Sequence, residues 1–438
     1  MPIIRKNLVL KNVVVAAGAA LILILYLLAY LTTHQEDFRI YLEASEAIKA
    51  GQDIYLATSN QYVYGPFLAV LLLPLTMFKV EIAKIIWGIA NLISVFVIVL
   101  LINKLRKKRN RSPISYPILL VIFLSSFSFR NNFGQGQAVT LVVIFWLFAV
   151  LLSKSEINFV LKYILVSLFT IGILEIKPYL GLGLILYFLI LKNHKFIFSL
   201  GLTVLGVHFF YQKFLAVNYF TWLDSLKLRS ETVIDGNDQA SLLTLLKVNF
   251  GVSNSFAITS FFMFLILITF VLFRKRQTLV NELESFTMII PLVISPFMHA
   301  HDLLLGLAGF ALILDLTRKA TRTQLVLLLS LLVLHVGWTS DVLIAGVLIL
   351  GILILSLWAW ASRLKFKASA LMFLLGFVQL MTLHSAFSIS DYSRIRAYNF
   401  LALLEGVILL ILASTATKPQ NDEMSVLSLP RDNIGLDS

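Results

Sequence analysis

The feature that most constrains this chain is a series of long apolar blocks separated by short clusters of lysine and arginine. The first block, from about Val9 to Leu31, is long enough to cross the hydrocarbon core of a bilayer as a helix. Hydrophobic residues make up 59% of the 438 residues and charged residues only 13%, which is too apolar for a soluble domain. We therefore predict an all-α polytopic membrane protein with roughly 12–14 transmembrane helices.

The basic clusters predict how these helices are oriented, because cytoplasmic loops are enriched in lysine and arginine. Arg5 and Lys6 precede the first block, which has no small-residue cleavage site and is too long for a signal peptide. Segment 66–78 is short and contains two prolines, so it is expected to be re-entrant or interfacial. The next block then crosses at about 82–103 and leaves the loop charges of 104–111 in the cytoplasm.

The resulting topology is a single domain over residues 1–415, integral to the cell (inner) membrane, with both termini cytoplasmic. Extracytoplasmic loops are predicted at about 33–81 and about 212–255, and residues 416–438 form a cytoplasmic polar tail. Shorter extracytoplasmic loops are expected at 130–137, 175–179, 298–302, 337–341 and 388–399. Because the cytoplasmic loops are short and basic, the functional site is expected on the extracytoplasmic face.

Several classes of function lack the residues they require. The formal charge of +13 lies in loop clusters, so no nucleic-acid partner is expected. The chain has no cysteine, which excludes disulfides and thiolate metal sites. The nucleotide-binding G-x-x-x-x-G-K-[ST], the hydrolase G-x-S-x-G and the zinc-protease H-E-x-x-H patterns are also missing, which argues against ATP-driven transport, serine hydrolysis and zinc proteolysis.

The first extracytoplasmic loop begins with an acidic stretch that has helical periodicity. Apolar residues recur at near-helical spacing between Glu36 and Ala50, and Gly51 is a stop signal. This pattern predicts an amphipathic helix with Asp37 in its first turn. Asp37 can serve there as a helix cap, or as a general base for a hydroxyl beside the membrane.

Other polar residues at predicted helix ends suggest contacts to an anion or a sugar. Lys177 can meet a lipid phosphate, although it can also snorkel or pair with Glu175. Gln135 and Gln137 lie in a glycine-flanked turn, which suits phosphate or sugar hydroxyls but also a plain polar turn. The histidines of His299-Ala300-His301-Asp302 are too close together for a helical metal pair, so substrate contact is favoured and no metal is expected.

Five sequence blocks together resemble glycosyltransferase family 87, the polyprenyl-phosphate-mannose-dependent mannosyltransferases of the GT-C superfamily. In chain order they are Asp37-Phe38 leading to Tyr62-Val63-Tyr64-Gly65-Pro66, then Gly134-Gln135-Gly136-Gln137, Ile176-Lys177-Pro178-Tyr179, Gly236-Asn237-Asp238-Gln239-Ala240-Ser241, and Ser295-Pro296 followed by His299 and His301. The chain departs from the family pattern at Gly65, where a proline is usual, at Gln137, where asparagine is common, and in the stretched Gly236 block.

The resemblance implies a GT-C-like bundle that transfers one sugar, with mannose expected, from a polyprenyl-phosphate donor to an extracytoplasmic glycan or glycolipid. It implies an inverting mechanism with Asp37 as the general base, within the lipid bilayer and without a cofactor or divalent metal. The donor phosphate would be bound by Lys177, His299, Gln135 and Gln137. The substrates would also be contacted by Tyr41, Tyr62, Tyr64, Asn237 and His301.

Two alternatives remain at the level of sequence. A multi-pass transporter or lipid-linked sugar flippase would also have many spans and intramembrane polar groups, but the chain has no visible internal repeat and its polar groups gather at helix ends. An O-antigen ligase or polymerase would be expected to carry several extracytoplasmic arginines, and this chain has few.

Overall fold

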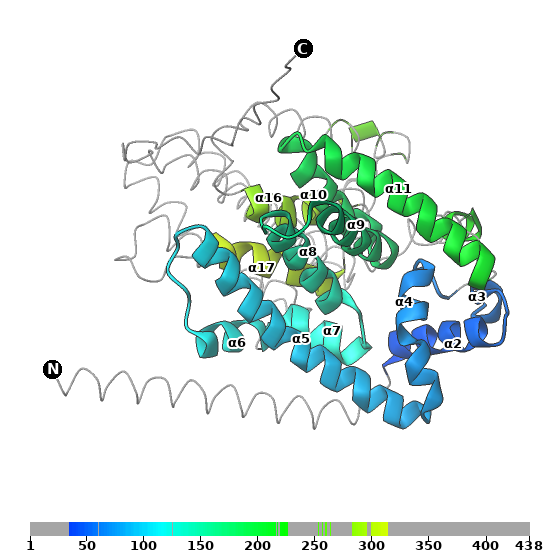
Figure 1. Cartoon of the computed structure of the whole chain (residues 1–438). Helices are drawn as coiled ribbons and strands as arrows, with labels where there is room; N and C mark the ends of the chain where they lie inside the picture. Colours follow the sequence, from blue (N-terminus) through cyan, green and yellow to red (C-terminus); the bar gives the residue numbers. More distant parts are fainter. Residues whose placement is uncertain are drawn as a thin grey trace, which may run out of the picture.

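The computed structural model describes residues 35–59, 61–124, 126–215, 217, 220–226, 253, 256, 259–260, 263, 283–295 and 299–313. These residues form helices joined by turns, and no strand occurs among them (Figure 1). The predicted all-α membrane fold is therefore confirmed for this part of the chain. The first apolar block, Asn237, most of the loop predicted at 212–255, the blocks beyond 313 and the tail lie outside the described residues.

The predicted amphipathic helix is present as α2 (Glu36–Lys49), with Asp37 in its first turn. Its apolar face is buried, including Phe38 and Tyr41, and Gly51 directly beyond its end has a φ of 66°, a left-handed conformation that glycine adopts without strain. Two short helices follow, α3 (Ile54–Ala57) and α4 (Pro66–Leu72), and α4 continues into the 3₁₀ turn Leu73–Met77. Segment 66–78 is thus too short to span a bilayer, as predicted.

Among the described residues, three helical segments are long and apolar enough to cross a membrane. They are α5 (Val80–Lys108), α9 (Phe159–Ile176) and His194–Leu215, which comprises α11 (His194–Phe210) and a π-helical turn. The shorter apolar helices are α10 (Pro178–Ile190), α16 (Leu283–Ile294) and α17 (Leu303–Ile313). The protein is therefore a membrane protein, with its spans packed around a common apolar core.

The apolar segment between the basic cluster at 104–111 and the loop predicted at 130–137 is divided into two helices. α6 (Tyr116–Leu124) ends early, and α7 (Phe127–Gln135) begins at a cap formed by Ser126, whose Oγ accepts the Phe129 N–H. The polar residues predicted as a loop at 130–137 therefore lie mostly inside a helix. α7 then meets α8 (Val139–Ser153) at a bend of 119°.

The basic cluster at 104–111 was predicted to be a loop, but most of it is helical, because α5 continues through Lys108. Arg106 is only 1% exposed and donates to the carbonyls of Ser112, Ala311 and Leu312. The last two carbonyls belong to the final residues of α17 that the structure describes. Arg109 and Lys154 form ion pairs with Glu284 at the start of α16. These charged side chains therefore connect α5 to α16 and α17 at one end of the bundle.

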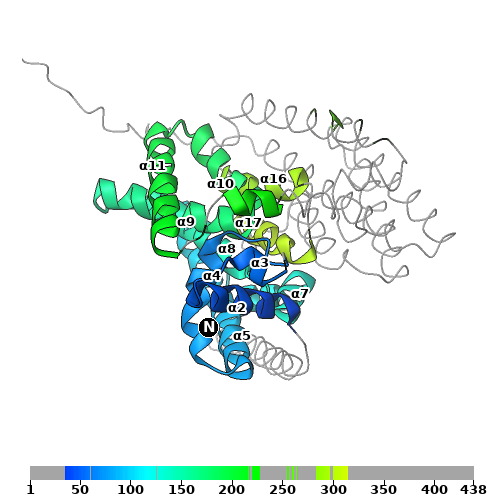
Figure 2. The same cartoon turned by 90° about the vertical axis from the view of Figure 1, so that its right-hand side faces the viewer.

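The opposite end of α5 carries the small helices. There α2 packs on α4 and α7, and α4 packs on α9 (Figure 2). The 3₁₀ turn Ala300–Asp302 precedes α17 and packs against α7. Segments from five separate parts of the sequence, near residues 37, 64, 137, 177 and 301, therefore meet at this end.

Candidate active site

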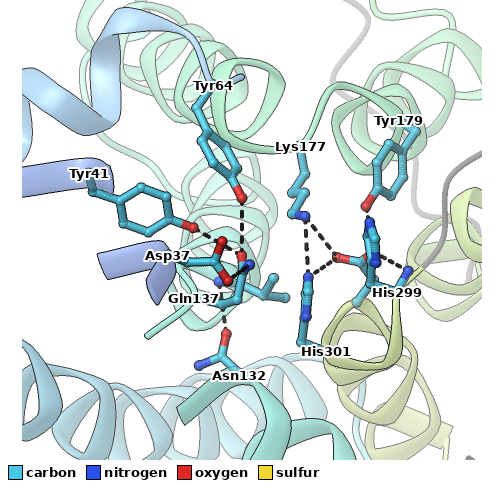
Figure 3. Close-up of polar contacts among 11 residues, drawn as sticks. Asp37, Tyr41, Tyr64, Asn132, Gln137, Lys177, Tyr179, His299 and His301 are labelled. Atoms are coloured by element: carbon cyan, nitrogen blue, oxygen red, sulfur yellow. Dashed lines mark hydrogen bonds and ion pairs between the residues drawn. The ribbon is translucent and has the colours of Figure 1, made fainter. Parts of the chain in front are cut away.

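Asp37 lies at the centre of the first polar group, which we call the carboxylate group (Asp37, Tyr41, Tyr64 and Gln137). Gln137 Nε2 donates to Asp37 Oδ2 at 2.6 Å. Gln137 Oε1 accepts from Tyr41 Oη at 3.0 Å and Tyr64 Oη at 3.3 Å (Figure 3). Asp37 itself is only partly buried.

The turn that carries Gln137 is held in place by α5. Gly136 has a φ of 72°, and its carbonyl accepts the indole N–H of Trp87 at 2.8 Å. Asn132 Oδ1 accepts the N–H of Val139, and its amide donates to Asn91 Oδ1 at 3.0 Å. A Cβ on Gly136 would lie 2.7 Å from Phe38 Cβ, so the glycine also permits the close approach to α2. These contacts fix the backbone on both sides of Gln137.

Lys177 forms the second polar group, the lysine group (Lys177, Tyr179, His299, His301 and Asp302). It is the single residue between α9 and α10, and Pro178 begins α10. Its ammonium is 3.3 Å from His301 Nε2 and 3.7 Å from Asp302 Oδ1. Asp302 Oδ2 accepts from Tyr179 Oη at 2.5 Å and from the His299 N–H at 2.8 Å. The two groups face each other, and the Tyr64 ring lies 5.7 Å from the ammonium (Figure 3).

The protonation states follow from burial and charge. Burial opposes the lysine cation, but the Asp302 and Asp37 carboxylates outweigh it and raise the pKa of Lys177. Burial also raises the pKa of Asp302, yet Lys177 and the histidines outweigh it and hold that pKa below its usual value. Burial lowers the pKa of His301 well below its usual value, so its ring is neutral at neutral pH. Lys177 and Asp302 therefore form a buried cation–anion pair beside a neutral His301.

The tautomer of His301 follows from its partner. An ammonium can only donate, so His301 Nε2 must accept from Lys177 and the ring proton sits on Nδ1. Nδ1 is buried and has no hydrogen-bond partner. Lys177 is 7% exposed, and its ammonium, which has three donor hydrogens, meets two acceptors among the described residues, His301 Nε2 and the Asp302 carboxylate. The group thus has hydrogen-bond donors to spare for an anion.

Glu175 does not pair with Lys177 in the way that their spacing suggested. Its Oε2 accepts the Phe67 N–H at 2.7 Å at the start of α4, and its backbone carbonyl accepts the Gly65 N–H at 2.7 Å. A Cβ on Gly65 would lie 2.5 Å from both Cβ and Cγ of Glu175. The glycine that replaces the usual proline therefore allows the Tyr64 segment to dock beside Lys177.

Gly65→Ala is expected to lower the thermal stability of the purified protein by about 1–3 kcal/mol, because the methyl group overlaps Glu175 and the backbone has to move. Gly201→Ala in α11 is the matched control, since its Cβ would meet open space. Thermal unfolding in detergent measures both variants. Equal stability of the two alanine variants would show that the Gly65 contact does not hold the segment.

The structure brings together most, but not all, of the residues selected from the sequence. Gln135 is exposed at the end of α7 and takes no part in either group. Tyr62 is buried beside Tyr41 and Tyr64, but its Oη donates to the Gly65 carbonyl and accepts the Ala69 N–H, which is a structural role. Asn237 lies outside the described residues. The residues selected from the sequence that do belong to the carboxylate group or the lysine group are Asp37, Tyr41, Tyr64, Gln137, Lys177, His299 and His301.

Sequence reasoning overlooked two members of the lysine group. They are Asp302, which directly follows His301, and Tyr179, which ends the Ile176-Lys177-Pro178-Tyr179 block. Among the described residues, no group of three or more His, Cys, Asp or Glu side chains has the geometry to hold a metal ion. Lys177 and His301 are 124 positions apart in the sequence, and Asp302 follows His301. Their proximity to Lys177 therefore cannot be predicted from the sequence.

Comparison with known proteins gives one match. The family model for glycosyltransferase family 87 matches residues 62–296, more than half of the chain. No curated protein matches the chain. The matched range includes Tyr64, Gln137 and Lys177, whereas Asp37 and the 299–302 segment lie outside it.

Proposed function

The chain belongs to glycosyltransferase family 87, and from this premise we propose that it transfers a single sugar, with mannose expected, from a polyprenyl-phosphate donor. It is a membrane glycosyltransferase, so both a lipid-linked donor and the bilayer are natural partners. The proposed acceptor is an extracytoplasmic glycan or glycolipid, and the proposed location of the site is the extracytoplasmic face of the inner membrane. No cofactor or divalent metal takes part in the proposed mechanism.

The observation that carries this proposal is the buried Lys177 ammonium facing the Asp37 carboxylate (Figure 3). A sugar linked to a phosphate has an electrophilic anomeric carbon next to an anion. The ammonium can donate charge-assisted hydrogen bonds to the phosphate, and the carboxylate can accept the proton of the hydroxyl that attacks the carbon. Asp37 is partly exposed, as a base that must meet the hydroxyl of an acceptor molecule has to be.

In the proposed reaction the acceptor oxygen attacks the anomeric carbon as the carbon–oxygen bond to phosphate breaks. The acceptor proton passes to Asp37, and polyprenyl phosphate leaves with one additional negative charge. A single displacement of this kind inverts the anomeric centre. Lys177 stabilises the developing charge, and His299 and His301 supply further donors, with the His301 Nδ1 hydrogen still unused. Tyr41 and Tyr64 line the side of the carboxylate.

The donor class can be tested with purified protein and a panel of radiolabelled sugar donors. Polyprenyl-phosphate mannose is expected to give labelled product with membrane-derived acceptor, and nucleotide sugars are expected to give none. Polyprenyl-diphosphate sugars are expected to react poorly, because one lysine partly neutralised by Asp302 is a small charge for a diphosphate. Preferential consumption of a nucleotide sugar or a diphosphate donor would overturn the proposed donor.

A further inference from the structure

We infer that Gln137 is a positioning residue that orients and keeps ionised the Asp37 carboxylate, and does not bind the donor phosphate. The inference rests on the proposed function of Asp37 as the general base. It differs from the role that the sequence motif suggested for Gln137. Three contacts of one side-chain amide carry it.

The first step is the orientation of the amide. Burial raises the pKa of Tyr41 and of Tyr64 above the usual value for tyrosine, so both phenols keep their protons and donate. Both donate to one atom of the Gln137 amide, which must therefore be its oxygen. The NH₂ group is left pointing at Asp37, where it donates to Oδ2 at 2.6 Å. The two tyrosines thus determine which end of Gln137 meets the carboxylate.

The second step is the rigidity of the support. Gln137 is 4% exposed, and its backbone N–H donates to the Asn132 carbonyl at 2.8 Å. The preceding carbonyl is held by Trp87. A donor fixed in this way stabilises the ionised carboxylate and limits its rotation, which leaves the remaining oxygen in a defined place for the acceptor proton.

The third step concerns the reach of Gln137 toward the donor. Its amide oxygen is occupied by two phenols and its NH₂ by Asp37, so its hydrogen-bonding capacity is largely used before a phosphate enters. The opposite group holds the Lys177 ammonium, and its His301 Nδ1 has no hydrogen-bond partner. Phosphate binding is therefore a role for the lysine group.

The inference predicts a change in pH dependence, so the other charges around Asp37 matter. On its own helix the exposed Arg39 pairs with Glu43, and it stays the same in all variants. Among the described residues, Tyr41 on α2, Tyr64 before α4 and Lys177 between α9 and α10 interact electrostatically with Asp37, and His299 and His301 before α17 lie on the far side of Lys177 (Figure 3). Substitution at position 137 leaves all of these side chains in the protein, and it changes the hydrogen-bond acceptor of two of them, Tyr41 and Tyr64.

The test is the pH–rate profile of the Gln137→Met and Gln137→Glu variants. Without the amide donor the carboxylate accepts a proton more readily, so the acid limb for Gln137→Met is expected to move up by about one to two pH units. Gln137→Glu places a second carboxylate against Asp37, and the pair then shares a proton, so its acid limb is expected to move further. Donor KM is expected to change by less than about threefold in both variants.

Gln52→Glu is the control, since it adds the same charge at an exposed position beyond the end of α2 and is expected to leave the profile unchanged. Unmoved acid limbs in both Gln137 variants would overturn the inference. A large increase in donor KM with an unmoved acid limb would overturn it too and assign Gln137 to the phosphate. Retention of activity in Asp37→Asn would instead overturn the proposed function, so the two failures are distinguishable.

Discussion

Asp37→Asn is expected to reduce sugar transfer on the order of 10²–10⁴-fold and to leave the protein folded. Asparagine has the size of aspartate and still offers Gln137 an oxygen acceptor, so the hydrogen bond that holds the position survives. It cannot accept a proton from the acceptor hydroxyl, so only the chemical step is lost. Donor binding, which depends on Lys177, is expected to persist.

The measurement is the initial rate of label transfer by purified protein, together with its thermal unfolding temperature. Glu46→Gln is a matched control, because it removes an exposed carboxylate from the same helix. It is expected to transfer sugar at the unmodified rate. Full activity in Asp37→Asn, with unchanged unfolding, would exclude Asp37 as the base.

Lys177→Met is expected to lower the transfer rate by about 10²–10³-fold, because the group that meets the leaving phosphate is lost. Donor KM should also rise, since the ammonium contacts the phosphate in both the bound and the transition state. This variant leaves the buried Asp302 without its cation, which can destabilise the protein as well. Loss of activity in the single variant therefore has two possible causes.

The double variant Lys177→Met with Asp302→Asn separates these causes. It removes both charges and is expected to recover most of the lost thermal stability, yet to remain as inactive as the single variant. Lys49→Met, at an exposed position of α2, serves as the control for loss of a positive charge. Recovery of transfer in the double variant would show that Lys177 only balances Asp302.

The sequence was a good guide to the parts of the fold set by local chemistry. The α2 helix, its end at Gly51 and the place of Asp37 in the first turn follow from periodicity and a stop signal. The short segment 66–78 follows from its length and its prolines. The break between α6 and α7 was not predicted, because it depends on a cap formed by Ser126 inside a predominantly apolar block.

The partners of the charged residues could not be predicted, because they are long-range contacts. Nearness in sequence suggested Glu175 for Lys177, but the folded chain places His301 and Asp302 there instead. Arg106 was grouped with orienting loop charges, although it is buried and holds the end of α17. Gln137 was selected from its motif, but its orientation depends on two tyrosines from a different part of the chain.

The fate of a labelled donor tests the central claim most directly, because a glycosyltransferase and a flippase treat it differently. The protein would be reconstituted in liposomes with polyprenyl-phosphate mannose labelled in both lipid and sugar, and with an acceptor. The account predicts one polyprenyl phosphate released for each sugar transferred, and loss of both products in Asp37→Asn. Movement of intact donor between leaflets, without transfer and without dependence on Asp37, would contradict it.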